Sequence, residues 1–146
     1  MKIIVRGTPA PQGSKRHVGH GVMIESSKKV KPWRESVKYA AIEARDGALP
    51  LDGPLFVRMV FTFIRPRGHY RSGIHSDKLR ADAPTHPKGY PDLSKLARST
   101  EDALTEARIW HDDAQVVEYY LSKVYANEGA DALDSLGAVI YVERYA

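Results

Sequence analysis

The most informative stretch of the 146-residue chain is residues 91–117, PDLSKLARSTEDALTEARIWHDDAQVV. From Leu93 to Ala107, apolar side chains recur at three- and four-residue spacing, which predicts a helix over residues 92–108 with one buried face. Asp92 follows a proline and is a suitable N-cap residue for this helix. Residues 114–125, AQVVEYYLSKVY, favour a strand. We therefore expect a helix followed along the chain by a strand, with aspartates close to the start of each.

Shorter patterns predict the remaining elements. Strands are expected at residues 2–6 (KIIVR), 55–66 (LFVRMVFTFIRP) and 137–144 (GAVIYVER), a helix from Lys31 that ends at 46–47, and a loop or small hairpin near 22–24. The chain is short enough for one domain, residues 1–146. This order of elements predicts an α+β fold, in which two main helices pack on one small mixed sheet.

Composition excludes several classes of protein. The chain has no Cys, so it has no disulfide framework, thiolate zinc site or cysteine nucleophile. No apolar run approaches the roughly 20 residues of a membrane span, and the start MKIIVRG lacks the apolar segment of a secretory signal. We therefore expect a cytoplasmic protein without a membrane partner.

Charge is distributed unevenly along the chain. Residues 1–38 hold nine Lys/Arg and two Asp/Glu, whereas residues 99–146 hold three and ten. The long loop expected at 65–91 has six Lys/Arg, two Asp and no usable period, and such loops are usually functional or mobile. Basic loops that also carry Tyr70 and Tyr90 favour a nucleic-acid partner, although a basic run is more often solvated surface.

Acidic residues suggest a metal site. Two neighbouring aspartates, Asp112 and Asp113, precede the strand expected at 114–125. Together with Asp92 they form an oxygen-rich set that suits Mg²⁺ or Mn²⁺. The alternative is that Asp92 only caps a helix and that the pair lies in a solvated turn. On the helix, Arg98 and Glu101 share a polar strip, where Arg98 could hold a phosphate oxygen and Glu101 could supply another metal ligand. The same two side chains could equally form a plain surface ion pair.

The motif at residues 91–117 resembles the RusA family of Holliday-junction resolvases, which are encoded largely by phages and prophages. The shared features are the Pro-Asp helix start, Asp-Ala-Leu within the helix, and Trp-x-Asp-Asp-Ala-Gln-Val-Val at the start of the strand. The early segment GTPAPQGSKR at residues 7–16 also looks like the family's Gly/Pro/basic loop. The resemblance implies a RusA-like fold and a homodimeric, Mg²⁺-dependent endonuclease (Mn²⁺ as a possible substitute) that acts on branched DNA in a bacterial host.

Carried over by position, Asp92 matches the family's first helix carboxylate, and Asp112 and Asp113 match its paired aspartates. Arg98 stands where the family has a catalytic basic residue, usually Lys, and Lys95 stands where many members have Asn. The residues predicted to contact DNA are Lys15, Arg16, Arg65, Arg67 and Lys95.

One departure concerns Ser94, which occupies the position of the family's second helix carboxylate. Serine cannot supply a charged metal ligand. Glu101 lies seven residues on, about two helical turns, on the same face. We hypothesise that Glu101 replaces the missing carboxylate; the other interpretation is that Ser94 weakens or abolishes the metal site.

The leading hypothesis is Mg²⁺-dependent hydrolysis of DNA phosphodiester bonds at four-way junctions during recombination and repair. The predicted metal ligands are Asp92, Glu101, Asp112 and Asp113, and Arg98 is predicted to offset charge on the phosphate. The alternatives are a structure-selective DNA-binding protein that has lost catalysis through Ser94, and an RNA-binding module with no dependence on divalent ions.

Overall fold

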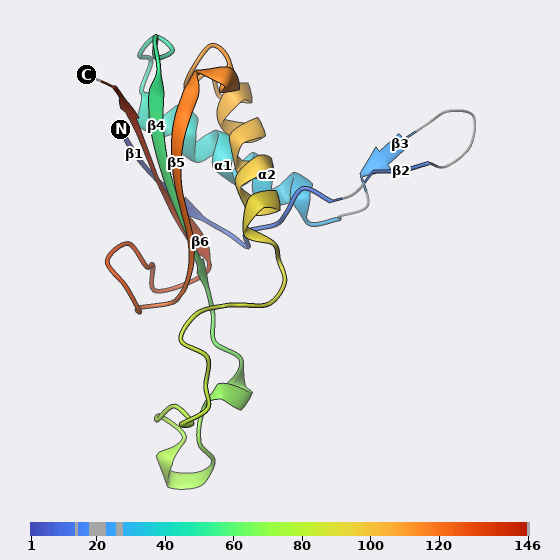
Figure 1. Cartoon of the computed structure of the whole chain (residues 1–146), viewed down its shortest axis with the longest axis vertical. Coiled ribbons are helices and arrows are strands. Elements are labelled where there is room, and N and C mark those ends of the chain that lie inside the picture. Colours follow the sequence, from blue (N-terminus) through green and yellow to red (C-terminus); the bar gives the residue numbers. More distant parts are fainter. Residues whose placement is uncertain (14, 18–22, 26–27, 146) are drawn as a thin grey trace.

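A four-stranded mixed sheet forms the centre of the molecule (Figure 1). The computed structural model describes residues 1–13, 15–17, 23–25 and 28–145, without the side chains of 15–17 and 23–25. The strands are β1 (Lys2–Arg6), β4 (Leu55–Phe63), β5 (Val116–Tyr125) and β6 (Gly137–Arg144), in the order β1-β6-β4-β5. Strand β6 lies antiparallel between β1 and β4, and β5 runs parallel to β4.

Two helices, α1 (Val30–Arg45) and α2 (Leu93–Glu106), lie on the same side of this sheet (Figure 1). Alternate residues of the strands, such as Val5 and Met59, are fully buried and pack against Trp33 of α1 and Leu96 of α2 in one core cluster. The buried face of the sheet and the apolar faces of the two helices thus form a single hydrophobic core between them. The arrangement confirms the predicted α+β fold with two helices on a mixed sheet.

A buried hydrogen bond joins the two helices within this core. The indole Nε1 of Trp33 donates to Thr100 Oγ1 over 3.1 Å, and that hydroxyl donates in turn to the Leu96 carbonyl over 2.8 Å. The indole and the hydroxyl are therefore both hydrogen-bonded, as burial requires. The contact fixes the position of α2, which carries the predicted site residues Lys95, Arg98 and Glu101.

Element boundaries differ from the sequence-based expectations by a few residues. Helix α2 ends at Glu106, and residues 113–115 form a short 3-10 helix, η3 (Asp113–Gln115), before β5 begins at Val116. Two short strands, β2 (Lys15–His17) and β3 (Met23–Glu25), pair as a small antiparallel hairpin. Residue 22, part of the predicted hairpin, falls outside the described residues.

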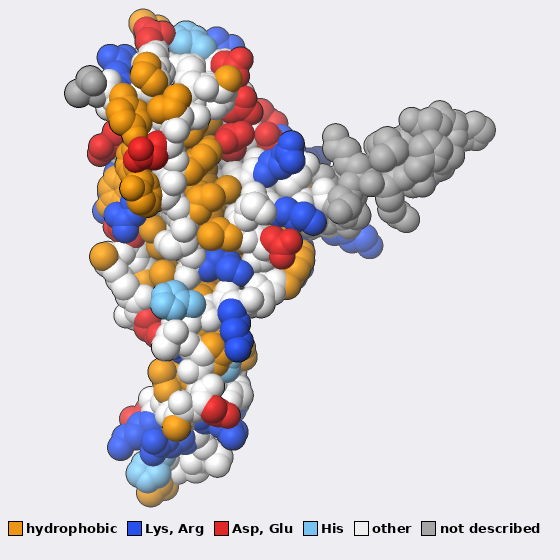
Figure 2. Space-filling model, in the orientation of Figure 1, with side chains coloured by type: hydrophobic (Ala, Val, Ile, Leu, Met, Phe, Trp, Pro, Cys, Tyr) orange, Lys and Arg blue, Asp and Glu red, His pale blue; other side chains and the backbone are white. Residues whose placement is uncertain are grey.

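Residues 64–91, the basic arm, connect β4 to α2. The arm contains two 3-10 turns, η1 (Arg67–His69) and η2 (Gly73–His75), and extends away from the sheet (Figure 1). In Figure 2, its outer end carries a concentration of Lys and Arg side chains. Among the described residues, no helix is long and apolar enough to cross a membrane.

Gly137 allows β1 and β6 to approach closely, because a Cβ at this position would lie 2.1 Å from the Val5 carbonyl oxygen and 2.7 Å from Leu133 Cδ1. We expect Gly137→Ala to lower the free energy of unfolding by about 3 kcal/mol or more, since backbone cannot yield as a flexible side chain can. Urea unfolding followed by circular dichroism measures this. Gly68→Ala is the control, because no heavy atom lies within 4 Å of its Cβ position; equal destabilisation of both variants would contradict the prediction.

Candidate active site

Asp92 lies at the start of α2, as its N-cap residue, with extended backbone angles (φ −65°, ψ 133°). Its side chain accepts no capping hydrogen bond, and it is exposed. The carboxylate is therefore available to a ligand rather than used by the helix. The next predicted residues along the helix, Ser94, Lys95 and Arg98, are exposed as well.

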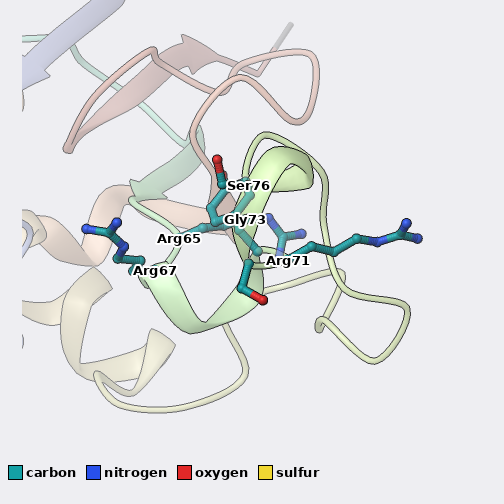
Figure 3. A pocket seen from close by; sticks show the side chains of 7 residues that line it. Arg65, Arg67, Arg71, Gly73 and Ser76 are labelled. Atoms are coloured by element: carbon teal, nitrogen blue, oxygen red, sulfur yellow. The ribbon is translucent and has the colours of Figure 1, made fainter.

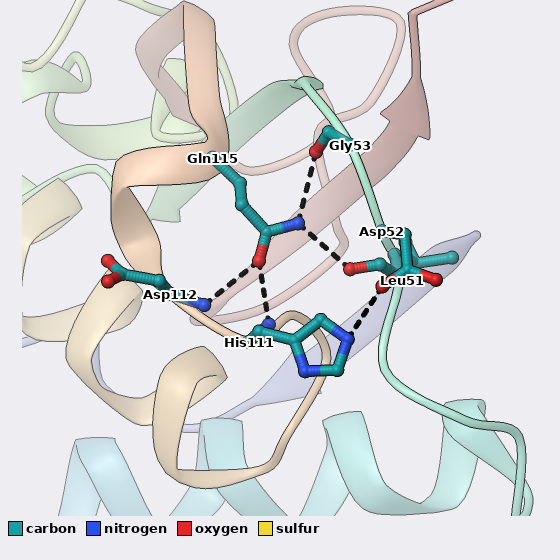
Figure 4. A network of polar contacts seen from close by, with 6 residues as sticks. All are labelled: Leu51, Asp52, Gly53, His111, Asp112 and Gln115. Carbon is teal, nitrogen blue, oxygen red and sulfur yellow. Dashed lines mark hydrogen bonds and ion pairs between the residues drawn. The ribbon is translucent and has the colours of Figure 1, made fainter.

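The paired aspartates lie in the turn that leads into β5. The Asp112 carboxylate accepts a 2.8 Å hydrogen bond from the Ala114 amide and so caps the 3-10 helix η3. Figure 4 shows this side chain pointing away from the polar network behind it. Asp112 therefore has a structural role of its own, whereas Asp113 is exposed and makes no such cap.

Gln115 holds this turn in place through four hydrogen bonds (Figure 4). Its Oε1 accepts from the backbone amides of His111 (2.8 Å) and Asp112 (2.9 Å). Its Nε2 donates to the carbonyls of Leu51 (2.9 Å) and Gly53 (3.0 Å). One amide side chain thus fastens the aspartate turn to the segment before β4.

The imidazole of His111 pairs with Asp52 rather than with the aspartate beside it in sequence. His111 Nε2 lies 2.7 Å from Asp52 Oδ1, with both side chains largely exposed. The contact joins the same two segments as Gln115 and so adds to the attachment of the turn. Its partners are 59 residues apart in sequence, which local patterns do not reveal.

Glu101 and Asp113 come together at the C-terminal half of α2. The Tyr119 hydroxyl, from β5, donates a hydrogen bond to Glu101 Oε2. Burial raises the pKa of Glu101; the Tyr119 hydrogen bond opposes this rise, and the hydrogen bond and charge of Asp113 add to it. Burial, followed by the Glu101 contact, raises the pKa of the Tyr119 phenol. The two carboxylates of Glu101 and Asp113 therefore repel each other when both are ionised, and a bound cation would offset this repulsion.

Asp102, beside this pair, is a site residue that the sequence reasoning missed. It is half-buried, and burial raises its pKa while the charges of Arg34 and Arg98 lower it. Its position four residues after Arg98 on one helix suits an ion pair between these two side chains, but that spacing alone gives no sign of the acidic group beside it. Arg98 thus faces an acidic neighbour and lies between the two acidic regions of α2.

Helix geometry separates these two regions. Asp92 and Glu101 are nine residues apart, a rise of about 13.5 Å along the axis, and Ser94 and Glu101 are seven residues apart, a rise of about 10.5 Å. Metal–oxygen distances are about 2.1 Å, so carboxylates at these two ends of the helix cannot both bind one cation. Among the described residues of one chain, no group of three or more acidic or His side chains could hold a metal ion. The predicted four-ligand set is therefore not assembled in one chain, and Glu101 lies beside Asp113 rather than in the place of a carboxylate at 94.

The predicted DNA contacts have different environments. Lys95 and Arg67 are exposed, whereas the Arg65 side chain is only 4% exposed and is hydrogen-bonded to Glu128. Lys15 and Arg16 lie in β2, and their side chains are outside the described part of the chain. On the arm, a hollow of about 650 Å³ is lined mostly by basic and small polar residues (Figure 3): Arg65, Arg67, Tyr70, Arg71, Ser72, Gly73 and Ser76.

Comparison with known proteins identifies the family. The family model described as Endodeoxyribonuclease RusA matches residues 6–132. The crossover junction endodeoxyribonucleases RusA of Enterobacteria phage 82 and of Escherichia coli (strain K12) are each 38% identical to this chain over 52 residues. That alignment covers 36% of this chain and 43% of each relative, so it spans less than half the length of the curated relatives.

The electrostatics of Glu101 lead to a prediction for stability. Because its folded-state pKa is raised, ionisation of Glu101 costs stability as pH rises through the ordinary glutamate range. We expect Glu101→Gln to stabilise the protein at pH 7 in metal-free buffer by up to about 1 kcal/mol, since the pair is partly screened by solvent. Thermal unfolding should show this gain shrinking as pH falls through the raised pKa of Glu101 and essentially absent below about 4.3, the ordinary glutamate pKa.

Glu43→Gln is the matched control for that measurement, because Glu43 is exposed on α1 and lies outside the acidic group. It should change the unfolding temperature little at either pH. A Glu101→Gln variant that is less stable than the unaltered protein at pH 7 would show that the carboxylate is held favourably.

Proposed function

This chain belongs to the RusA endodeoxyribonuclease family, and we propose that it hydrolyses DNA phosphodiester bonds at four-way junctions during recombination and repair, in the cytoplasm of a bacterial host. The observation that carries the proposal is the match over residues 6–132 together with the Gln115-fastened aspartate turn, which sets Asp113 beside Glu101. A partly exposed acidic group beside the exposed Arg98 suits the cleavage of a polyanion, because it can hold a cation while the guanidinium offsets phosphate charge.

The residues have distinct proposed roles. Asp113 and Glu101 form the acidic half of the site, and Asp92 supplies a carboxylate from the other end of α2. Arg98 is exposed between them and would offset the negative charge that develops on the phosphate. The proposed DNA contacts are Lys15, Arg16, Arg67 and Lys95, with Arg65 assigned a supporting role because its guanidinium is buried and paired.

A second copy of the chain would bring the two acidic regions together. Strand β5 is one of the two edge strands of the sheet. Its Val117 and Tyr120 are 61% and 59% exposed, so it offers an apolar edge that favours pairing. Asp113 precedes one end of β5. Near the other end, Lys123 Nζ donates to the Pro91 carbonyl over 2.8 Å, next to Asp92. Antiparallel pairing of two β5 strands would therefore bring Asp113 towards Asp92 of the partner subunit.

This geometry supports a homodimer with shared sites, and two-fold symmetry suits a four-way junction, whose arms have nearly the same symmetry. Within one chain the donors do not fit a metal ion, whereas acids from two chains would give the oxygen ligands that Mg²⁺ prefers. Bound there, Mg²⁺, or Mn²⁺ in its place, would activate water and stabilise charge on the phosphate.

The proposed activity is tested with a labelled four-way junction, a linear duplex of the same sequence and an RNA hairpin, each with Mg²⁺, with Mn²⁺ and with EDTA. We expect paired nicks in the junction only when a divalent ion is present. Junction binding that survives in EDTA, with no nicking at any ion concentration, would instead identify a binding protein inactivated at Ser94. Cleavage of the linear duplex at an equal rate would identify a general nuclease.

Mixing two inactive variants tests whether sites are shared between subunits. Asp92→Asn and Asp113→Asn should each abolish cleavage alone. If each site combines Asp92 of one subunit with Asp113 of the other, a mixed dimer retains one intact site and should nick the junction on one strand. If each site lies within one chain, every site in the mixture lacks a carboxylate, and mixing should restore nothing. Single-turnover gels after subunit exchange distinguish the two results.

A further inference from the structure

The basic arm is folded on itself rather than extended. The Arg71 amide donates to the Lys78 carbonyl and the Arg80 amide donates to the His69 carbonyl, both over 2.8 Å. A β-bridge between Tyr70 and Leu79 lies between these two bonds. The arm therefore has a closed, hydrogen-bonded outer loop whose shape does not depend on a bound partner.

An ion pair at the root of the arm joins the arm to the turn that follows β5; its Arg65 side chain is buried, whereas its Glu128 side chain is 38% exposed. Arg65 Nε and Nη2 donate to the two carboxylate oxygens of Glu128 over 2.6 and 2.8 Å, in a bidentate geometry. The guanidinium lies 4.0 Å from the ring centroid of Tyr125, which is itself buried at the end of β5. Arg65 Nη1 also lies 3.1 Å from His69 Nδ1, and the His69 ring packs edge-on against Tyr125. The Arg65 guanidinium, which contacts Glu128, His69 and Tyr125, thus attaches the root of the arm.

Beyond this attachment the arm presents cations to solvent. Residues 66–90 hold five Lys/Arg and two Asp. Asp82 lies 3.4 Å from Arg80 and is paired with it, while the Arg67 and Arg71 side chains project in different directions from the hollow between them (Figure 3). An exposed, positively charged hollow beside Tyr70 matches the phosphates and bases of a nucleic acid.

We propose that the basic arm is a preformed hook that grips a DNA arm of the substrate, and that Glu128 is the positioning residue that sets the hook's angle through Arg65. The inference deepens the proposed function and rests on it for the identity of the DNA. Its distinctive consequence is that an acidic residue supports the binding of a polyanion.

The physical reason lies in the burial of Arg65. A guanidinium that is 4% exposed stays in place only while its charge is paired. Without the Glu128 carboxylate, Arg65 gains by moving to water, and the root of the arm moves with it. The hook then samples many angles, and the measured affinity falls in proportion to the fraction of molecules in the binding geometry.

The experiment measures DNA binding in EDTA, so that it does not depend on cleavage. We expect Glu128→Gln to raise the Kd for a four-way junction roughly tenfold, the value for a hook that is correctly oriented in about one molecule in ten. Hydrogen exchange of peptides from residues 64–91 should become faster in the free variant. The salt dependence of binding should also weaken, by about one unit of slope for each phosphate that the hook no longer neutralises.

Two further variants separate positioning from direct contact. Arg65→Lys keeps the positive charge but cannot form the bidentate pair, so it should lose affinity to a similar degree. Asp82→Asn removes an exposed negative charge from the arm itself and frees Arg80, so binding should be unchanged or tighter. Thermal unfolding of each variant confirms that the sheet remains folded.

The inference is overturned if Glu128→Gln binds DNA as tightly as the unaltered protein or more tightly, as removal of a negative charge alone would predict. It is also overturned if Arg65→Lys keeps full affinity, since Arg65 would then act as an ordinary phosphate contact. A protein that loses binding in these variants but cleaves no junction leaves the hook in place and contradicts the proposed activity instead.

Discussion

The parallel pairing of β4 with β5 is the constraint on which the rest of the structure depends. Parallel neighbours require a crossover, and here the crossover consists of the basic arm followed by α2. The helix must therefore run back along the sheet before β5 can begin. Its first residue, next to Asp92, and the turn with Asp112 and Asp113 are consequently placed at opposite ends of one helix. The separation in space of Asp92 from Asp112 and Asp113 follows from that topology.

The same crossover explains the position of the arm. It leaves the sheet where β4 ends, and β5 ends beside it, so Arg65 and Glu128 meet although they are 63 residues apart. Acidic and basic surfaces are thus built at different ends of the molecule from one continuous connection. At the acidic end, burial and the neighbouring Asp113 raise the pKa of Glu101, whereas the basic end contains an ion pair that lowers the pKa of Glu128. One end favours a cation, and the other keeps its own charges paired.

The sequence predicted those features that local patterns encode. The period of α2, the strand at residues 2–6 and the aspartates just before β5 were each expected from neighbouring residues. The contacts of Tyr119 with Glu101, of Asp52 with His111 and of Glu128 with Arg65 were not, because each joins distant segments. A helical wheel also placed Glu101 on the face of Ser94, but the two turns between them separate the side chains by about 10.5 Å along the axis, too far for Glu101 to act at position 94. Periodicity identifies a face, whereas tertiary packing decides which residues on that face can act together.

Gln115 shows how narrowly such packing can restrict one position. Its side chain must accept two amide protons at one atom and donate to two carbonyl oxygens at the other. A carboxylate offers no donor and an ammonium no acceptor, while asparagine has the right groups on a stem shorter by one methylene. Because an amide does not titrate in the physiological range, the attachment is also insensitive to pH. The turn that carries the aspartates can therefore keep its shape while the charges around it change with protonation or with a bound ion.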